Sequence, residues 1–421
     1  MIALTTLNRR ARFAALLAAA LSLSTPIWSQ QASDQAPALA LRAFGTLGLA
    51  RSSSAHAQFA RDLSQPYGVS DQWSGKIDSV LGVQANYRLH DKVEAVAQAV
   101  SRYGAEDNFK PEVSWAFLKY EPDARLSLRG GRIGTDLFMG ADSRLIGYSY
   151  LPVRPSPDFF FTLMLSYFDG MDVQVTQPMG EGVVRAKLYA GHAREKIPVL
   201  NDILDFSGSP LVGGFIDYQQ GAWMWRASYG QLRSSSELPG MGALLSGLNQ
   251  YNAALRLPSA QAAADDLAMK DKFIHYYSLG MLYDEGPLQI HAMVNRIHKD
   301  FASAKSTESG MFLLGYRIGS VTPFAGYSWI NAQDKFVDTG LGRVIGPNAV
   351  DAGIQLFIDA SHVQQNTVTL GLRWDFQRNM ALKIQGDMVR GAPSSVFPYR
   401  GVDAAFDGHT SVLSIALDFI L

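Results

Sequence analysis

The sequence contains no cysteine among its 421 residues, and this absence excludes a disulfide framework. The 37 lysines and arginines are balanced by 38 aspartates and glutamates, so the basic surface of a nucleic-acid-binding protein is also missing. Stability must therefore come from a large core or from backbone pairing, and nucleic acid is not an expected partner.

Long apolar runs are also missing after the N-terminal region. The longest candidate, Phe159 to Phe168, has ten residues and includes Thr162 and Ser166. A helix needs about 20 apolar residues to cross a membrane. We therefore expect no helical membrane anchor in the mature chain.

The N-terminus has the composition of a secretory signal peptide. Arg9, Arg10 and Arg12 precede an apolar stretch from Phe13 to Leu23, and a small-residue cleavage site follows at Ser29. We predict a signal peptide over residues 1–29 and a single mature domain over residues 30–421. Removing three arginines and no acids changes the formal net charge from −1 to −4.

Apolar and polar residues alternate along much of the mature chain, as they do in strands with two different faces. In one segment Val368, Leu370, Leu372 and Trp374 alternate with Thr369, Arg373 and Asp375. Charged residues on the second face indicate that this face is wet. A transmembrane barrel alternates in this way and so has an average hydropathy.

The last ten residues continue this pattern to the end of the chain. Leu413, Ile415, Leu417, Phe419 and Leu421 lie on one face of a predicted strand, which is unusual because chain ends are generally polar and frayed. An ordinary buried strand would give the same pattern. In a barrel, this strand would close against the first strand and face lipid.

Short connections and long polar segments alternate between the predicted strands. Short ones include Glu121-Pro122-Asp123 and Asp284-Glu285-Gly286, and long ones include residues 52–70, 233–270 and 332–363. The count is roughly sixteen strands, enough to enclose water. We predict an all-β fold, a transmembrane antiparallel β-barrel of about 16 strands.

One aperiodic segment, residues 134–167, is rich in apolar residues. An exposed loop of this composition would be a liability, so we expect it to pack against something. It follows the fifth predicted strand, and we predict that this third outer loop folds into the lumen.

The chain resembles a Gram-negative outer-membrane porin of a proteobacterial porin-like group. The segments RGGRIG (129–134), GYSYLPVRPSPDFFF (147–161) and SYFDGMDVQV (166–175) carry the resemblance in motif, and the strand count carries it in architecture. The Pro-Glu-Phe-Gly element of the best-known general porins is missing from this loop.

The resemblance implies a location and a set of partners. It implies the outer membrane of a Gram-negative bacterium, contact with outer-membrane lipid and lipopolysaccharide, and a homotrimer. The C-terminal strand is similar to the signal that barrel-assembly machinery reads, except that it ends in Leu421 rather than an aromatic residue. Small hydrophilic solutes would be the transported molecules.

The resemblance also implies a basic wall facing an acidic loop at the narrowest point of a pore, where side-chain charges select ions. We predict a pore constriction of Arg129, Arg185 and Lys187 against Asp136 and Asp142. The other predicted lumen-lining residues share the wet face of the strands: Arg42, Glu94, Arg125, Arg226 and Arg373. The excess of cations suggests weak anion preference, although these charges could simply solvate a wide pore.

The leading function is passive diffusion of small hydrophilic solutes. A substrate-specific channel is the alternative, because Tyr148, Tyr150 and Phe159 to Phe161 could form an aromatic path. An outer-membrane barrel hydrolase is a distant third, and an exported soluble β-sandwich is a structural outsider. No catalytic constellation, metal site or cofactor motif is evident in the sequence, so we predict a non-enzymatic protein.

Overall fold

The computed structural model describes residues 38–163, 165–199, 202–393 and 399–421. The predicted signal peptide and its cleavage site at Ser29 lie outside the described residues. The chain divides into two units, Met1–Ala38 and Leu39–Leu421, and the structure below is that of the second unit.

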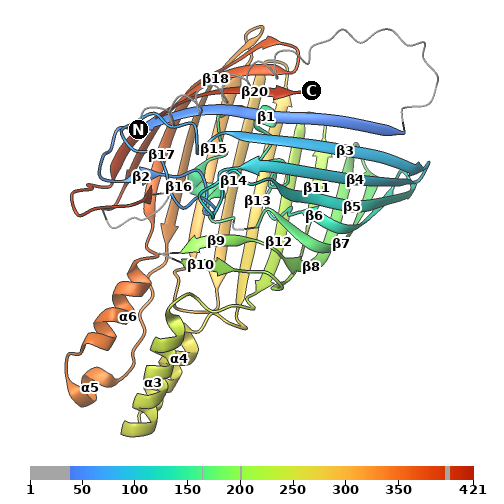
Figure 1. The fold of residues 1–421 in the computed structure, drawn as a ribbon. Helices are drawn as coiled ribbons and strands as arrows, with labels where there is room; N and C mark the ends of the chain where they lie inside the picture. Colours follow the sequence, from blue (N-terminus) through green and yellow to red (C-terminus); the bar gives the residue numbers. More distant parts are fainter. Residues whose placement is uncertain (1–37, 164, 200–201, 394–398) are drawn as a thin grey trace, which may run out of the picture. The chain divides into compact units, whose positions relative to one another are not determined.

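Sixteen strands pair in one closed antiparallel barrel, as predicted (Figure 1). In chain order they are β1 (Leu39–Ser52), β3 (Val80–His90), β4 (Val93–Arg102), β5 (Glu112–Asp123), β6 (Leu126–Gly134), β7 (Tyr167–Met179), β8 (Gly182–Ala193), β11 (Pro210–Gln220), β12 (Trp223–Arg233), β13 (Phe273–Glu285), β14 (Leu288–Lys299), β15 (Thr307–Tyr316), β16 (Val321–Ala332), β17 (Gln364–Gln377), β18 (Met380–Gly391) and β20 (His409–Ile420).

The first and last strands close the barrel. β1 pairs with β20 from Phe44 opposite Ile420 to Ser52 opposite Val412. Ala43 and Leu421 exchange two backbone hydrogen bonds of 3.0 and 2.7 Å. The terminal segment is therefore the closing strand of the barrel, in the position predicted from its alternation.

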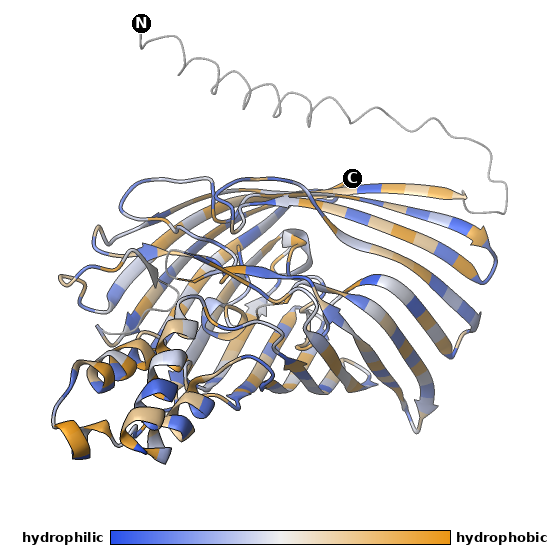
Figure 2. Cartoon of the chain, turned by 60° about the horizontal axis from the view of Figure 1, so that its bottom comes forward, coloured by the Kyte–Doolittle hydropathy of each residue, from blue (hydrophilic) through white to orange (hydrophobic). Residues whose placement is uncertain are grey.

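The two faces of the wall follow the period of two. On β20, Leu413 and Ile415 are exposed on the outside, whereas Ser414 and Asp418 are buried on the inside. Figure 2 shows the same alternation as hydrophobic and hydrophilic bands along each strand. Because inward and outward residues alternate, the sequence pattern identifies the inner face directly.

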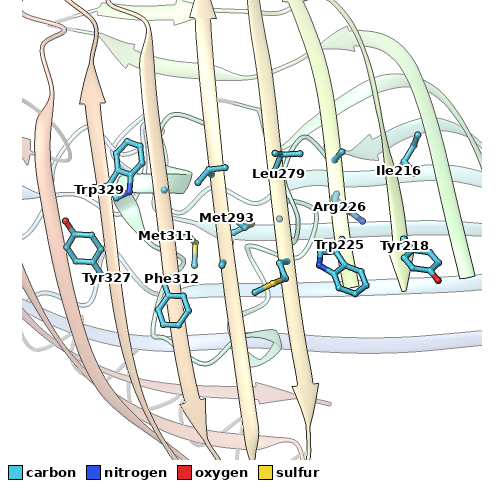
Figure 3. Close-up of a pocket in the computed structure, with 16 residues that line it drawn as sticks. Ile216, Tyr218, Trp225, Arg226, Leu279, Met293, Met311, Phe312, Tyr327 and Trp329 are labelled. Carbon is cyan, nitrogen blue, oxygen red and sulfur yellow. The ribbon is translucent and has the colours of Figure 1, made fainter. Parts of the chain in front are cut away.

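The outer face is apolar and rich in aromatic residues. A depression of about 690 Å³ lies on the wall between β11 and β16, and Figure 3 shows the side chains that line it. Its lining includes Trp225, Phe312, Tyr327 and Trp329, together with small residues such as Gly310. An exposed apolar surface of this kind fits contact with acyl chains.

The connections differ between the two ends of the barrel. At the short-turn end, the strand pairs β7–β8, β11–β12, β13–β14 and β17–β18 join through two-residue turns. Gly180, Gly221, Gly286 and Asn379 have φ between 56° and 65° there, the left-handed conformation that tight hairpins need. Long loops connect the strands at the other end, which we call the long-loop end.

Four helices extend the long-loop end: α3 (Met241–Leu255), α4 (Pro258–Leu267), α5 (Leu341–Ile345) and α6 (Ala349–Asp359) (Figure 1). They lie in segments that the sequence analysis treated as polar loops. Leu248, Leu267, Ile354 and Ile358 are buried in one hydrophobic cluster, which explains why these segments fold. Within the described residues, no helix has the length and apolarity that crossing a membrane would require.

Two small sheets complete the long loops. One pairs β9 (Lys196–Val199) with β10 (Asp202–Asp205), and the other pairs β2 (Gln58–Phe59) with β19 (Tyr399–Arg400).

The third long loop, residues 135–166, lies inside the barrel and forms much of the core. It contains a 3₁₀ turn, η1 (Gly147–Ser149), and a short helix, α2 (Pro157–Phe160). Phe138 packs edge-on against Phe159 and Tyr276, with ring centroids 5.2 and 6.3 Å apart. The apolar residues of this loop are thus buried against the inner wall, as their composition predicted.

Candidate functional site

The candidate site is a charged cluster on the inner faces of β6, β7, β8, β11 and β12. Strand register places its members opposite one another. Arg129 pairs with Asp172 across β6 and β7, and Asp217 on β11 pairs with Arg185 on one side and Arg226 on the other.

Asp136 of the third loop joins this wall. Its carboxylate accepts hydrogen bonds from Lys187 Nζ at 2.8 Å and from Arg226 Nη1 at 2.7 Å. Burial raises the pKa of Asp136, but the charges of Lys187 and Arg226 outweigh burial and hold the pKa below its usual range. The beginning of the loop is therefore bonded to the basic wall.

Arg226 is the most enclosed cation of the cluster. Besides Asp136, it donates to Asp217 Oδ1 at 2.6 Å, and its guanidinium lies 3.7 Å from the centre of the Phe215 ring. Little water reaches the guanidinium of Arg226. Its positive charge is compensated by the two carboxylates and by stacking on the aromatic ring.

Arg129 and Arg185 are the cations that face water. Their side chains are 23% and 39% exposed, although each is bonded to a buried carboxylate, Asp172 and Asp217 respectively. Both guanidinium groups are therefore partly accessible from the lumen while they remain bonded to their partners.

Asp142 is the exposed carboxylate of the third loop, and no hydrogen bond or ion pair is found for it within the described residues. Although Asp142 is accessible from the lumen, the loop and wall atoms around it desolvate its carboxylate, and this raises its pKa. The nearby charge of Asp136 raises the pKa further, against the opposing effect of Lys187, Arg226 and Arg129. Asp142 thus becomes neutral at a higher pH than an ordinary aspartate does.

The structure places the five predicted constriction residues around one region of the lumen. Lys187 contacts Asp136 directly, and Asp142 interacts electrostatically with Arg129 and Lys187. Arg185 is joined to the same cluster through Asp217 and Arg226. Asp217 was not among the predicted residues, although the alternation of β11 places it on the inner face.

The predicted lumen-lining residues do not all lie on the inner wall. Arg42 and Glu94 are on the inner wall, and Glu94 accepts from Asn86 at 3.0 Å and contacts Lys119 at 3.1 Å. Arg226 belongs to the charged cluster. The prediction for Arg125 was wrong, because this residue lies in the turn between β5 and β6. It is therefore at the short-turn end and not on a strand.

Arg373 is on the inner wall but it binds the third loop. Its Nη1 donates to the carbonyl oxygens of Tyr148 at 2.9 Å and Tyr150 at 3.1 Å, and Asp375 balances its charge. This residue therefore holds the loop in place and is not a free pore charge.

Two fully buried cations anchor the third loop to the opposite wall. Lys383 donates to the carbonyl oxygens of Gly147, Tyr150 and Pro152 at 2.8, 2.6 and 2.9 Å. Arg154 forms ion pairs with Asp78 and Asp387, each at 2.7 Å. The sequence analysis did not identify this anchoring role, although Lys383 and Asp387 lie on the inward face of β18.

Asp158 also anchors the loop. Its carboxylate is buried and accepts hydrogen bonds from Ser328 and Gln365, both at 2.7 Å. Burial raises its pKa. The loop thus crosses the lumen from Asp136 at β8 and β12 to Asp158 at β16 and β17.

Each wall cation of the cluster is bonded to a carboxylate, so the local charges almost cancel. Arg129, Arg185, Lys187 and Arg226 face Asp136, Asp172 and Asp217, and Asp142 is the fourth carboxylate. In the described part of the chain, no group of three or more His, Asp or Glu residues is placed to hold a metal ion.

No protein-family model and no curated protein matches the chain. Solved structures do. An anion-selective porin from Comamonas acidovorans is 12% identical, with a TM-score of 0.54 over 91% of this chain and 100% of that one.

Salmonella typhi OmpF in complex with daunomycin is 9% identical, with a TM-score of 0.53 over 91% of this chain and 97% of that chain. The outer membrane channel DcaP of Acinetobacter baumannii is 11% identical, with a TM-score of 0.51 over 90% and 97%. At these identities the likeness concerns the fold, and the chain has the closed sixteen-stranded barrel fold of these outer-membrane porins.

Proposed function

We propose that this protein is an outer-membrane channel of a Gram-negative bacterium, through which small hydrophilic solutes diffuse passively. The observation that carries the proposal is the third loop. It crosses the inside of a closed barrel, is bonded to both sides, and leaves Arg129, Arg185 and Asp142 accessible beside a charged wall. The barrel fold of the structural neighbours supports the same function.

The channel is weakly charge-selective at a constriction formed by Arg129, Arg185, Lys187, Asp136 and Asp142. Weak selectivity follows from charge pairing, because a cation bonded to a carboxylate attracts an ion less than an isolated one. The preference is for anions when Asp142 is protonated, since the cluster then has one more cation than carboxylates.

The proposal includes export by the signal peptide, assembly by barrel-assembly machinery through β20, and a homotrimer in contact with lipid and lipopolysaccharide. The small outward residues Ala95, Ala97 and Ala99 on β4 are where another barrel could approach closely. The apolar, aromatic outer face supports the membrane location (Figure 3).

Planar-bilayer recording tests this function. We expect stepwise conductance increases that scale with salt concentration, and a small reversal potential in a salt gradient. A folded protein that inserts but conducts no ions would contradict the channel.

A substrate-specific channel is the second candidate, and the aromatic residues that suggested it are mostly used in packing. Phe159 and Phe161 are buried, and the ring of Tyr150 lies 4.9 Å from Lys383 Nζ. Saturable uptake of one solute class by liposomes would favour this candidate. Hydrolase assays of the detergent-solubilised protein test the enzymatic alternative.

A further inference from the structure

The two sides of the lumen have different chemistry below the third loop, toward the short-turn end. One side, on β12 to β15, has a row of mainly apolar inward residues. Register places Met224, Leu282, His291 and Leu313 next to one another across four consecutive strands. We call this row the apolar stripe.

The apolar stripe is partly open to the lumen. Met224, Leu282 and His291 are partly exposed, and Leu313 is 9% exposed. The row above it is more covered, because Gly280 lies against Met139 of the third loop and Met293 is buried. The stripe is therefore less covered by the loop than the row above it.

Loop residue Leu151 extends the same surface. It lies directly over Gly315, where a side chain would overlap it, and Gly315 is the next inward position after Leu313 on β15. The apolar surface thus continues from the wall onto the lower side of the loop.

The opposite side of the lumen is polar. In the closed strand order, β13, β14 and β15 lie eight places from β3, β4 and β5 respectively, which is half of the barrel. The inward residues of β3, β4 and β5 form a hydrogen-bonded chain. Gln84 donates to Asn86 at 2.7 Å, Asn86 donates to Glu94 at 3.0 Å, and Lys119 contacts Glu94 at 3.1 Å. We call this row the polar ladder.

The polar ladder offers hydrogen bonds more than net charge. Lys119 is shared between Glu94 and Glu121, at 3.1 and 3.0 Å, and Gln98 donates to Gln84 at 2.9 Å. Amides and paired charges suit hydroxyl groups, which both donate and accept hydrogen bonds.

From these two surfaces we infer that the lumen binds amphipathic solutes in passage, with a hydroxyl-bearing part toward the polar ladder and an apolar ring or chain toward the apolar stripe. This inference rests on the proposed channel function and specifies its solute class. A solute of this kind removes apolar area from water at the stripe while its hydroxyl groups remain hydrogen-bonded.

Single-channel recording with two neutral probes tests the inference. Phenyl β-D-glucoside and methyl β-D-glucoside share the sugar, but only the first has an apolar ring. We expect phenyl β-D-glucoside to interrupt the current for about ten times longer per event, which corresponds to the burial of a small apolar group. Equal interruption times for the two glucosides would overturn the inference.

The variant Met224→Gln/Leu282→Asn makes the stripe polar with little change in volume. We expect its interruptions by phenyl β-D-glucoside to shorten toward those of the methyl compound. Met281→Gln is the control. Met281 is next to Leu282 on β13, but its side chain is on the outer face, so this variant should behave as wild type. A double variant that keeps the long interruptions would exclude the stripe.

These outcomes are distinguishable from a failure of the proposed function. A protein that conducts no ions contradicts the channel itself, whereas a conducting channel that does not discriminate between the two glucosides contradicts only the amphipathic solute class. Heat-modifiable gel migration establishes that each variant is folded.

Discussion

Lys383 on β18 and Asp418 on β20 form an ion pair of 2.8 Å in which neither side chain is exposed at all. Lys383 also satisfies three carbonyl oxygens of the third loop, and Asp418 accepts from Thr46 of β1 at 2.5 Å. One buried pair therefore joins the loop to the two strands that close the barrel.

Replacing Lys383 should destabilise the barrel strongly. Lys383→Met leaves the charge of Asp418 buried without its partner, which costs about 3–5 kcal/mol in comparable pairs. We expect a lower temperature for the heat-induced gel shift of the folded barrel. The variant Lys383→Met/Asp418→Asn should recover part of the loss, and an unchanged transition in the single variant would contradict the role of the pair.

Gly147 should tolerate no side chain. A Cβ at this position would overlap with Thr46 Oγ1 and Asp418 Oδ1 at the same time. We expect Gly147→Ala to cost about 1–3 kcal/mol through forced displacement of the loop, measured by the same transition. Gly386→Ala is the matched control, because a Cβ at Gly386 meets nothing within 4 Å. Equal stability of the two variants would show that the loop is not held closely at Gly147.

Removing the charge of Asp136 should shift ion selectivity toward anions. In Asp136→Asn, Lys187 and Arg226 lose the carboxylate that both contact, so the cluster gains one net positive charge. Reversal potentials in a salt gradient measure the change. Asp158→Asn is the control, because Asp158 is buried against Ser328 and Gln365, away from the cluster. A similar shift in both variants would contradict a local effect.

Acidification should shift selectivity in the same direction through Asp142. Its pKa is raised, so it becomes neutral at a pH above the ordinary value of about 4 for aspartate. Lowering the pH through this range removes the negative charge of Asp142, so the cluster becomes net positive. We expect anion preference to increase as pH falls, and Asp142→Asn to show increased anion preference at neutral pH with little further change. An Asp142→Asn channel with the full pH response would exclude this residue.

Deleting Phe419 to Leu421 should block assembly. The deletion removes the pairing of Phe419 with Gly45 and of Ile420 with Phe44, as well as both hydrogen bonds between Ala43 and Leu421. Leu421→Phe should be harmless, because Leu421 is half exposed on the outer face. Heat-modifiable migration measures assembly, and normal insertion of the truncated chain would contradict the closing role of β20.

The barrel could be predicted because its strands and turns are encoded by patterns of neighbouring residues in the sequence. Alternation assigns Leu413 to the outside and Asp418 to the inside from sequence alone, and short turns separate neighbouring strands. Arg125 was misplaced because turns and strand ends cannot be separated by periodicity to within one or two residues. The inward location of residues 135–166 followed from their apolar content.

The helices and the loop anchors could not be predicted in this way. α3 and α6 lie in long loops, and their residues Leu248, Ile354 and Ile358 are buried as part of one large hydrophobic cluster. The contacts of Arg154 join residues 76 and 233 positions apart in the chain. No periodicity encodes such pairs, because they depend on which strands the closed order brings together.

The position of Gly147 between Thr46 and Asp418 has a consequence for the order of folding. β1 and β20 are at opposite ends of the chain, and their pairing is the last contact needed to complete the ring of strands. The third loop contacts both strands from the inside, and Arg154 of the same loop bonds Ser414 of β20. These internal bonds across the seam can form only once the loop lies inside the barrel, so a chain whose loop is still outside lacks them.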